Sequence, residues 1–356
     1  MAHRTSDAVW SAQGTSPDAI EAALRQLLIE KHAERNDITP ARVLNMIAFV
    51  DREWTGEIAN RLRGVGRYHA SRMVVLAYEP KRERLDARVM MTADEHAAPG
   101  ELALLRETVV VELGDRHLDD LLTISDPLVV TDLPTLLWSP HGHYEIVADL
   151  LPLAQAVLLD SVEEPLAAEA LERACSLSEE AYVVDLAWLR STPWRERVAA
   201  MFDPPRLRDE LGRLSHVTVR HHPASTAAAM LLVGWLASRL GWKTEALAQD
   251  DDALAGHAHA GEQEISLRLE HAPELPVPGL EGLTIETAAG HRLRLDRGPG
   301  GLHARFLAPG EEDREWTILG GSRGEQGVLG EGIRQALLRD PTYVPALNAA
   351  RTLIPA

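Results

Sequence analysis

Cysteine is nearly absent from this 356-residue chain, and long apolar runs are absent altogether. With Cys175 alone, neither an internal disulfide nor a zinc or iron–sulfur site with several thiolate ligands can form within one chain. The longest apolar run covers residues 227–237, well short of the roughly 20 residues that a membrane-spanning helix needs. This run therefore predicts a buried helix, and we expect no association with membranes.

Basic residues are outnumbered, with 36 Lys and Arg against 54 Asp and Glu and a net charge of −18. Such a chain repels phosphate backbones and anionic lipid headgroups, so nucleic acid and membrane surfaces are poor candidate partners. Hydrophobic residues make up 45% and charged residues 25%, as in soluble globular proteins. Because the opening residues lack the continuous apolar segment of a secretory signal, we expect a cytoplasmic protein.

Residues 1–160 alternate between helical and strand patterns. Alternation of this kind favours a partly parallel sheet with helices on its faces, so we predict an N-terminal α/β sandwich whose ligands would lie beyond the strand carboxyl ends. The predicted helices cover residues 16–35, 53–69, 115–130 and 143–154, and the predicted strands cover residues 42–51, 71–78, 84–91, 102–113, 132–140 and 155–161.

After residue 160 the pattern changes, and residues 161–356 predict a C-terminal α+β domain with a mixed or antiparallel sheet. Residues 248–264, which contain Asp250, Asp251 and Asp252, are the most loop-like stretch. The other predicted elements are helical segments within 185–214, a strand over 216–222, a buried helix over 225–240, short antiparallel strands within 264–319, and helices over 331–340 and 343–353.

The glycine-rich segment 320–332 joins a strand to a helix and could hold an anion. Glycines let backbone N–H groups approach a phosphate, and the following helix start adds a partial positive charge. The segment has neither the GK[ST] ending nor the G-x-G-x-x-G pattern, and Glu325 and Glu331 carry the wrong charge. The alternative is a flexible or partner-docking turn. The residues placed to contact an anion are Gly321, Ser322 and Arg323.

A second candidate anion site follows the predicted helix 53–69. Its residues are Arg67, His69, Ser71 and Arg72, which could bind an anion together. The alternative is that a glycine ends the helix in a left-handed conformation, with Arg67 and His69 facing the negative helix end.

Metal binding and nucleophilic catalysis find little support. Two H-x-H pairs occur, His141/His143 and His257/His259, but no spacing supplies a dependable third ligand. No G-x-S-x-G motif is present, and Cys175 lies on a predicted helix, where packing explains it. We therefore expect no metal, no cofactor and no catalytic residue.

The most conspicuous cluster is DLAWLRSTPWRERVAAMFD, residues 185–203. Trp and Arg contribute much of the energy of protein interfaces, so one reading is a partner-docking surface. The alternative is core packing, with Thr192 capping a helix begun by Pro193. The candidate partner-binding residues are Asp185, Trp188, Arg190, Thr192, Trp194 and Arg195.

This string and four others resemble the glucose-6-phosphate dehydrogenase assembly protein OpcA family. The others are ARVLNMIAFV from residue 41, HASRMVVLAYEP from residue 69, DLPTLLWSP from residue 132 and AVLLDS from residue 156, and they occur in the order typical of the family. The D-L-x-W-x-R-x-T-P-W-R string is the most specific of them.

The resemblance implies a non-enzymatic partner of glucose-6-phosphate dehydrogenase that promotes its active oligomer and so supports the oxidative pentose phosphate pathway and NADPH supply. An allosteric activator of this kind would bind the active arrangement of the enzyme more tightly than the inactive one. The family supplies no catalytic residues to transfer, and a single cysteine does not fit redox control. The alternative is a sugar-phosphate-binding module or enzyme that uses the loop from Gly320 to Gly332.

Overall fold

The computed structural model describes residues 8–34, 38–39, 42–65, 71–93, 103–319 and 324–355. Two compact units share the chain. Unit 1 comprises Met1–Leu159, Glu180–Val184 and Glu325–Leu338, and unit 2 comprises Asp160–Glu179, Asp185–Gly324 and Arg339–Ala356. The division of the sequence at residue 160 into two domains stays a prediction.

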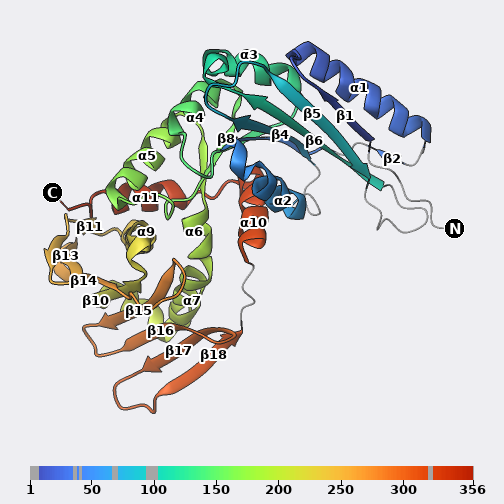
Figure 1. Ribbon diagram of the computed structural model, residues 1–356. Helices are drawn as coiled ribbons and strands as arrows, with labels where there is room; N and C mark the ends of the chain where they lie inside the picture. Colours follow the sequence, from blue (N-terminus) through green and yellow to red (C-terminus); the bar gives the residue numbers. More distant parts are fainter. Residues whose placement is uncertain are drawn as a thin grey trace. The chain divides into compact units, whose positions relative to one another are not determined.

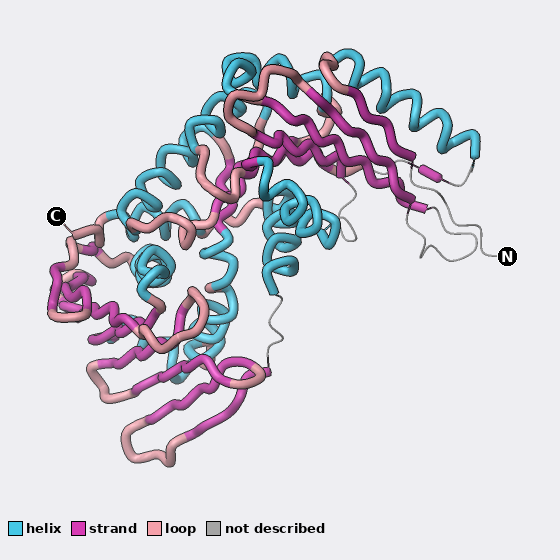
Figure 2. The backbone as a smooth tube through the Cα atoms, viewed as in Figure 1, coloured by secondary structure: helices cyan, strands magenta, loops and turns pink. Residues whose placement is uncertain are grey.

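Unit 1 is built around a nine-stranded sheet with helices on its faces (Figures 1 and 2). In Figure 1, α1 and α3 follow one face and α2 lies against the other. The strands are β1 (Ala8–Ala12), β2 (Ile38–Thr39), β3 (Leu44–Asp51), β4 (Ser71–Tyr78), β5 (Asp86–Ala93), β6 (Ala103–Leu113), β7 (Thr135–Trp138), β8 (Ala156–Leu159) and β9 (Tyr182–Asp185). The helices are α1 (Pro17–Glu34), α2 (Thr55–Val65), α3 (Leu121–Ser125), α4 (Tyr144–Leu150) and α10 (Gly324–Leu338), with 3-10 turns η1 (Arg52–Trp54), η2 (Asp115–Asp120), η3 (Asp126–Leu128) and η4 (Leu151–Leu153).

The sheet of unit 1 has the order β1-β5-β6-β4-β3-β7-β8-β9. Strands β6, β4, β3, β7 and β8 pair in parallel, whereas β5 pairs with β6 and with β1 in antiparallel fashion. Every residue of β3 is buried except Asp51, as expected for a parallel strand covered on both faces. The partly parallel sheet predicted from the alternation is confirmed.

The direction of strand addition reverses at β3. The chain continues from β3 to β4 and β6 on one side, then returns to place β7 and β8 on the other side. This is the order of a doubly wound sheet, and its switch point lies between β3 and β7. Ligands of such sheets bind at the switch point, so the residues that follow β3 and β7 are informative about function.

Several details of unit 1 differ from the sequence prediction. The glycine-rich segment 320–332 was predicted to be a loop before a helix over 331–340, but the helix α10 already begins at Gly324. The helix predicted over 115–130 contains only five α-helical residues, with 3-10 turns on both sides. Strand β1 and strand β9 were not predicted, because each is short and is stabilised by pairing with a strand far away in the sequence.

Unit 2 combines a second nine-stranded sheet with helices that cover one face (Figure 1). Its order is β11-β13-β14-β10-β15-β16-β17-β18, and only the β10–β14 pair is parallel among the pairings described. The strands are β10 (Leu214–His221), β11 (Lys243–Thr244), β12 (Ala248–Asp250), β13 (Ala253–Ala260), β14 (Gln263–His271), β15 (Leu280–Thr287), β16 (Arg292–Gly298), β17 (Gly301–Leu307) and β18 (Arg314–Leu319). The helices are α5 (Ala167–Glu180), α6 (Leu186–Arg190), α7 (Thr192–Phe202), α8 (Pro205–Arg208), α9 (Thr226–Leu240) and α11 (Tyr343–Arg351), with 3-10 turns η5 (Asp209–Arg213) and η6 (Pro223–Ser225).

Helix α9 forms the centre of unit 2, and the buried helix predicted there is confirmed. Ten of its residues, including the run Ala227–Gly234, are buried. It packs closely against α11, because a Cβ on Gly234 would stand 2.3 Å from the carbonyl oxygen of Ala346. Across the described residues, no helix combines the length and apolar content needed to cross a membrane.

The loop predicted over residues 248–264 is wrong, since this segment forms β12, β13 and the start of β14. Its polar clusters are tight hairpin turns, with left-handed φ angles of 51° at Asp251 and 65° at Gly261. Two-residue hairpins favour such residues. The strands between the turns carry mostly Ala, Gly and His, so their hydrophobic alternation is too weak to be read from the sequence.

Candidate functional site

The D-L-x-W-x-R-x-T-P-W-R string runs from the end of β9 through α6 into α7. Asp185 caps α6, with its carboxylate accepting the N–H of Ala187 at 2.9 Å. Pro193 lies in the first turn of α7, as predicted, but the cap position is Ser191 rather than Thr192. The local fold therefore follows standard helix-start chemistry.

The polar groups of the string connect the three chain segments that form unit 2. Asp185 accepts hydrogen bonds from Ser161, through its N–H at 3.1 Å and its hydroxyl, and from the Tyr343 hydroxyl at 3.2 Å. Arg190 forms an ion pair with Asp160 at 2.7 Å. Trp188 Nε1 donates to Asp340 at 2.9 Å. Segments beginning at Asp160, Asp185 and Arg339 are thus held together by the string.

Trp188, Trp194 and Arg195 all lie in the interior, with exposed fractions of 2%, 3% and 9%. The Arg195 guanidinium stacks over the Trp188 ring, 3.5 Å from its centroid. It also donates to the Trp188 carbonyl and to the hydroxyls of Ser191 and Thr192. Their burial favours core packing for these three side chains, and direct partner contact by the string stays a prediction.

Burial changes the pKa values of this network. Desolvation, followed by the charge of Asp160, raises the pKa of Asp185 to about 6. Desolvation lowers the pKa of Arg195 to about 10, although Asp340 opposes this shift. The pKa of Asp340 is lowered: burial acts to raise it, but hydrogen bonds from Thr342 and Trp188 outweigh that effect.

The candidate anion sites are only partly described. Arg67, His69, Gly321, Ser322 and Arg323 lie outside the described residues. Ser71 is buried at the start of β4.

Arg72 is already engaged inside unit 1. Its Nε donates to the buried Glu107 carboxylate at 2.7 Å, and Arg42 pairs with the same carboxylate. Its Nη1 donates to the Leu128 carbonyl at 3.2 Å. An anion at this position would compete with Glu107 for the guanidinium.

The two H-x-H pairs differ in position. His257 and His259 lie on β13 rather than in a loop, within 3.4 Å of Glu264 and 3.2 Å of Glu245 respectively. His141 contacts Trp54, and burial lowers the His141 pKa. Within the described part of the chain, no group of three or more His, Cys, Asp or Glu residues could hold a metal ion.

The switch point of the unit 1 sheet carries acidic and ring side chains. His143 Nε2 lies 3.0 Å from Asp51 Oδ1, and its ring packs 5.1 Å from Phe49 and 5.8 Å from Tyr78. His143 has a left-handed φ of 57°.

Chemistry at the switch point disfavours a dinucleotide. A sheet of this type binds pyrophosphate on a glycine-rich turn after its first strand. Here β3 ends at Asp51, and Arg52, Glu53 and Trp54 follow it, with no glycine before α2 begins at Thr55. This turn therefore carries two carboxylates and no glycine.

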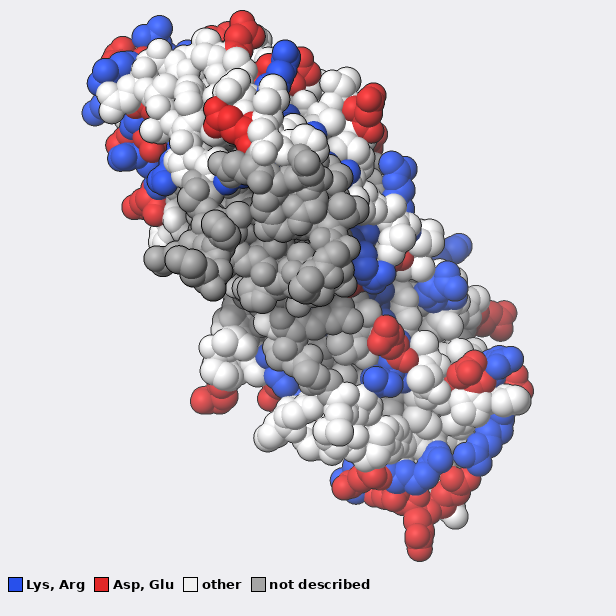
Figure 3. All heavy atoms as spheres, turned by 90° about the vertical axis from the view of Figure 1, so that its right-hand side faces the viewer, with Lys and Arg blue, Asp and Glu red and all other residues white. Residues whose placement is uncertain are grey.

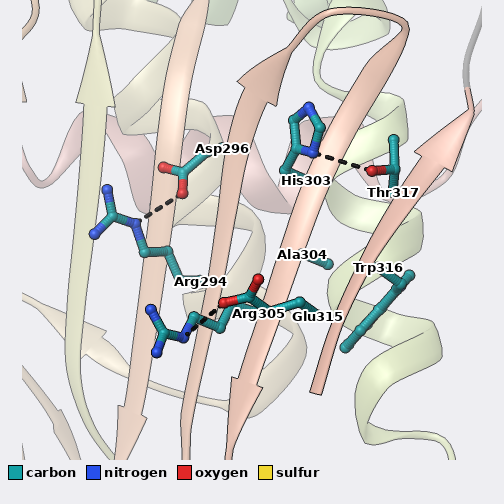
Figure 4. Close-up of a pocket in the computed structure, with 8 residues that line it drawn as sticks. All are labelled: Arg294, Asp296, His303, Ala304, Arg305, Glu315, Trp316 and Thr317. Carbon is teal, nitrogen blue, oxygen red and sulfur yellow. Dashed lines mark hydrogen bonds and ion pairs between the residues drawn. The ribbon is translucent and has the colours of Figure 1, made fainter. Parts of the chain in front are cut away.

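A shallow cavity of about 380 Å³ lies on strands β16, β17 and β18 (Figure 4). Its polar side chains already pair with one another. Arg294 pairs with Asp296 on the same strand at 2.8 Å, and two pairs link β17 to β18: Arg305 with Glu315 at 3.2 Å, and His303 with Thr317 at 3.0 Å. Acidic and basic side chains are also interspersed over the face shown in Figure 3. Such paired charges describe a solvated sheet face better than a substrate site.

Sequence reasoning missed the distant members of the network, namely Asp160, Ser161, Asp340 and Tyr343. Tyr343 lies 158 positions from Asp185, and Asp340 lies 152 positions from Trp188. No local spacing indicates such contacts. The only available signal is that Asp160 and Asp185 each end an apolar run.

The geometry defines a doubly wound α/β unit with no glycine in the described turn between β3 and α2, together with a mixed-sheet unit. Sequence models of two family domains match this chain: the glucose-6-phosphate dehydrogenase subunit N-terminal domain over residues 63–176 and the C-terminal domain over residues 181–347. Together they cover most of the sequence, and the chain belongs to the glucose-6-phosphate dehydrogenase assembly protein OpcA family.

Curated relatives carry the same name. The OxPP cycle protein OpcA of Synechococcus elongatus is 30% identical over 142 residues, which cover 38% of this chain and 32% of the relative. The protein of that name from Synechocystis is 31% identical over 119 residues, covering 32% of this chain and 25% of the relative. The matched regions thus span about a third or less of these relatives.

Solved structures resemble the chain only distantly. The apo scyllo-inositol dehydrogenase of Lactobacillus casei has a TM-score of 0.45 and 13% identity, covering 88% of this chain and 96% of that protein. Likeness at this level supports no argument about function.

Proposed function

We propose that this protein is a non-enzymatic assembly factor and allosteric activator of glucose-6-phosphate dehydrogenase in the oxidative pentose phosphate pathway. The family membership supports this partner, since both matching domains are described as parts of a glucose-6-phosphate dehydrogenase subunit. The proposal that the protein is not an enzyme rests on the switch point of the unit 1 sheet. The turn there contains Asp51 and Glu53 but no glycine, and the His143 ring contacts Asp51. We further propose a cytoplasmic location.

The activating step is differential binding. If the protein binds the active oligomer of the dehydrogenase more tightly than the inactive form, the population shifts by that affinity ratio. Coupling of about 1–3 kcal/mol, usual for allosteric effectors, changes apparent affinity roughly 5- to 150-fold. NADPH supply would then rise without any reacting group on this chain.

Mixing the purified protein with its cognate dehydrogenase tests the proposal. We expect a lower apparent KM for glucose 6-phosphate and a larger assembly by light scattering. The protein alone, supplied with glucose 6-phosphate and NADP, should produce no NADPH. Unchanged kinetics together with unchanged assembly size would refute activation, whereas turnover by the protein alone would support an enzyme.

The string from Asp185 to Arg195 remains our proposed partner-binding element, acting through the surface that its buried network shapes. Its contribution can be separated from folding by measuring affinity and melting temperature on the same variants. Loss of affinity with an unchanged melting temperature supports docking, while a lowered melting temperature supports packing.

A further inference from the structure

One corner of unit 2 gathers basic groups on the face of the sheet that α9 covers. Strands β14 and β10 run in parallel and end at His271 and His221. Strand β16 runs in the same direction, because β15 is antiparallel to both β10 and β16. The carboxyl ends of all three strands therefore meet at one edge, beside the start of α9.

The start of α9 has no side-chain cap of its own, although the 3-10 turn η6 that runs into it is capped by His222, whose Nδ1 accepts the Ala224 N–H at 3.1 Å. Ser225 occupies the cap position, but its hydroxyl accepts the N–H of Gly279 at 2.7 Å instead of a helix N–H. The Thr226 hydroxyl donates to the Pro223 carbonyl, and no acidic residue lies in the first turn. The partial positive charge of this 15-residue helix is therefore not compensated by its own side chains.

His221 supplies an independent sign of a missing ligand. Its side chain is completely buried, and its Nδ1 contacts the His222 carbonyl at 2.8 Å. Its Nε2 is buried without a hydrogen-bond partner. His221 alternates with the buried Val217 and Val219 along β10, so its ring lies on the same face of the sheet as they do. This is the face covered by α9, which follows β10 in the chain. Buried polar atoms are rarely left unpaired, because desolvation is costly.

Arg297 brings a permanent positive charge to the same corner. Arg297 lies two positions after the buried Leu295 and therefore on the same face of β16, but unlike Leu295 it is exposed at the strand end. Its Nη2 lies 2.7 Å from the position that a Cβ on Gly279 would occupy, and Gly279 has a φ of 141°. The N–H of Gly279 donates a hydrogen bond to the Ser225 hydroxyl at the start of α9. The Arg297 guanidinium, which lies against Gly279, is therefore close to that helix start.

Carboxylates do not neutralise this corner. Among the described residues, no Asp or Glu pairs with Arg297, His221 or His271, although the chain carries a net charge of −18. Glu281, which follows β15's first residue, pairs with Arg220, and Glu274 lies exposed in the preceding loop. The second imidazole, His271, stands with its ring 5.1 Å from His221.

We propose that the corner formed by His221, His271, Arg297 and the start of α9 binds a phosphate group. Donors approach from the helix, from the guanidinium and from the imidazole, which suits a tetrahedral oxyanion better than a planar carboxylate. In the free protein, burial lowers the His221 pKa to about 4, and Nε2 is an acceptor because Nδ1 donates to the His222 carbonyl. The negative charge of the bound anion opposes this shift, so that Nε2 takes up a proton and donates a hydrogen bond to the anion. The ligand is a small phosphate monoester or inorganic phosphate, and its binding does not depend on the dehydrogenase.

Titration of the full-length protein with inorganic phosphate, methyl phosphate and acetate tests this site. We expect saturable binding of phosphate by calorimetry, little binding of acetate, and a large upfield shift of the His221 Nε2 resonance in nitrogen NMR spectra as this atom becomes protonated. Arg297→Gln should weaken phosphate binding at least tenfold. The matched control is Arg292→Gln, which removes the same charge from the opposite face of the same strand and should change affinity less than twofold.

Two further variants test whether the phosphate binds at this corner or at the glycine-rich segment. Gly279→Ala should displace the Arg297 guanidinium and weaken binding, while Arg323→Gln in the glycine-rich segment should leave it intact. Methyl phosphate binding as well as phosphate supports an esterified ligand, and binding of inorganic phosphate alone supports the free ion. Absence of saturable binding, equal effects of Arg297→Gln and Arg292→Gln, or loss of binding in Arg323→Gln would overturn the site.

Discussion

At the scale of single residues, Asp185 illustrates how one side chain serves several purposes in this protein. It caps α6 and receives hydrogen bonds from Ser161 and Tyr343 while almost completely buried. Replacing a carboxylate with such contacts by an apolar group would leave several donors unpaired, which costs about 1–3 kcal/mol per donor. The residue is therefore constrained by the architecture of unit 2, independently of any partner.

Asp185→Asn should reduce the pH dependence of stability. Because burial raises the pKa of Asp185 to about 6 from 3.8, the folded state holds this proton more tightly than the unfolded chain. Its contribution to the free energy of unfolding is greatest below about pH 4 and declines as pH rises toward 6. The difference is on the order of 3 kcal/mol. Urea unfolding between pH 4 and pH 7 measures the free energy of unfolding of wild type and of Asp185→Asn, and Asp203→Asn at an exposed position is the control. A difference between Asp185→Asn and wild type that does not change with pH would contradict the raised pKa.

Trp194→Ala should destabilise the protein strongly. Its buried indole lies in unit 2, and removing a buried Trp side chain typically costs about 3–5 kcal/mol through lost contacts and a cavity. Arg195→Ala should cost less, about 1–3 kcal/mol, since it removes the guanidinium hydrogen bonds to the Trp188 carbonyl and to the Ser191 and Thr192 hydroxyls. Glu196→Ala, on the exposed side of α7, serves as control for chemical denaturation. If Trp194→Ala and Arg195→Ala were as stable as wild type, these two side chains would not stabilise the core.

At the scale of elements, the β3–α2 connection and the α9–α11 pair show how the presence or absence of a single glycine shapes the local structure. The connection after β3 is a 3-10 turn that follows Asp51 and ends at Trp54, and its residues include two carboxylates and no glycine. The α9–α11 pair depends on one glycine, because only a residue without Cβ lets the two backbones approach so closely.

Gly234→Ala should destabilise unit 2 by about 1–3 kcal/mol, because the added methyl would overlap the Ala346 carbonyl and the Ala350 N–H of α11. Gly330→Ala in α10 is the matched control, since no atom lies within 4 Å of its added Cβ. That control should be neutral or stabilising by up to about 1 kcal/mol through helix propensity. Thermal and urea unfolding measure both, and equal effects would contradict the close packing.

At the scale of the whole molecule, a net charge of −18 and interspersed surface charges describe a protein whose binding energy must come from specific complementarity. Long-range attraction to polyanions is excluded by the sign of the charge. If the protein assembles with glucose-6-phosphate dehydrogenase, binding to the folded state must also stabilise it.

Saturating dehydrogenase should therefore raise the melting temperature of this protein. At 100 times the Kd, the stabilisation is about 2.7 kcal/mol, which corresponds to a few degrees for a chain of this size. Differential scanning fluorimetry with this protein labelled would detect the shift, with an unrelated dehydrogenase as control. An unchanged melting temperature at concentrations where the kinetics respond would contradict a stable complex.

Much of the fold could be predicted where apolar patterns are long. The helix α1 and the strands β3 and β4 follow directly from their periodicity, because burial of a whole face or a whole strand leaves a clear pattern. The strands β12 and β13 could not be predicted, since Ala, Gly and His form a strand there only through pairing with β14. Short strands owe their stability to neighbours that local sequence does not specify.

The features of the candidate site can likewise be separated into those that the sequence predicts and those that depend on tertiary contacts. The sequence by itself determined the family, the acidic charge, the exclusion of disulfides within one chain and the helix start at Pro17, because these depend on composition or on contacts within a few residues. Only the tertiary structure decided that Trp188 and Arg195 face inward, that Asp185 meets Tyr343, and that His221 and Arg297 share a corner. Each of these depends on chain segments brought together from far apart, and a linear pattern carries no record of which distant groups meet.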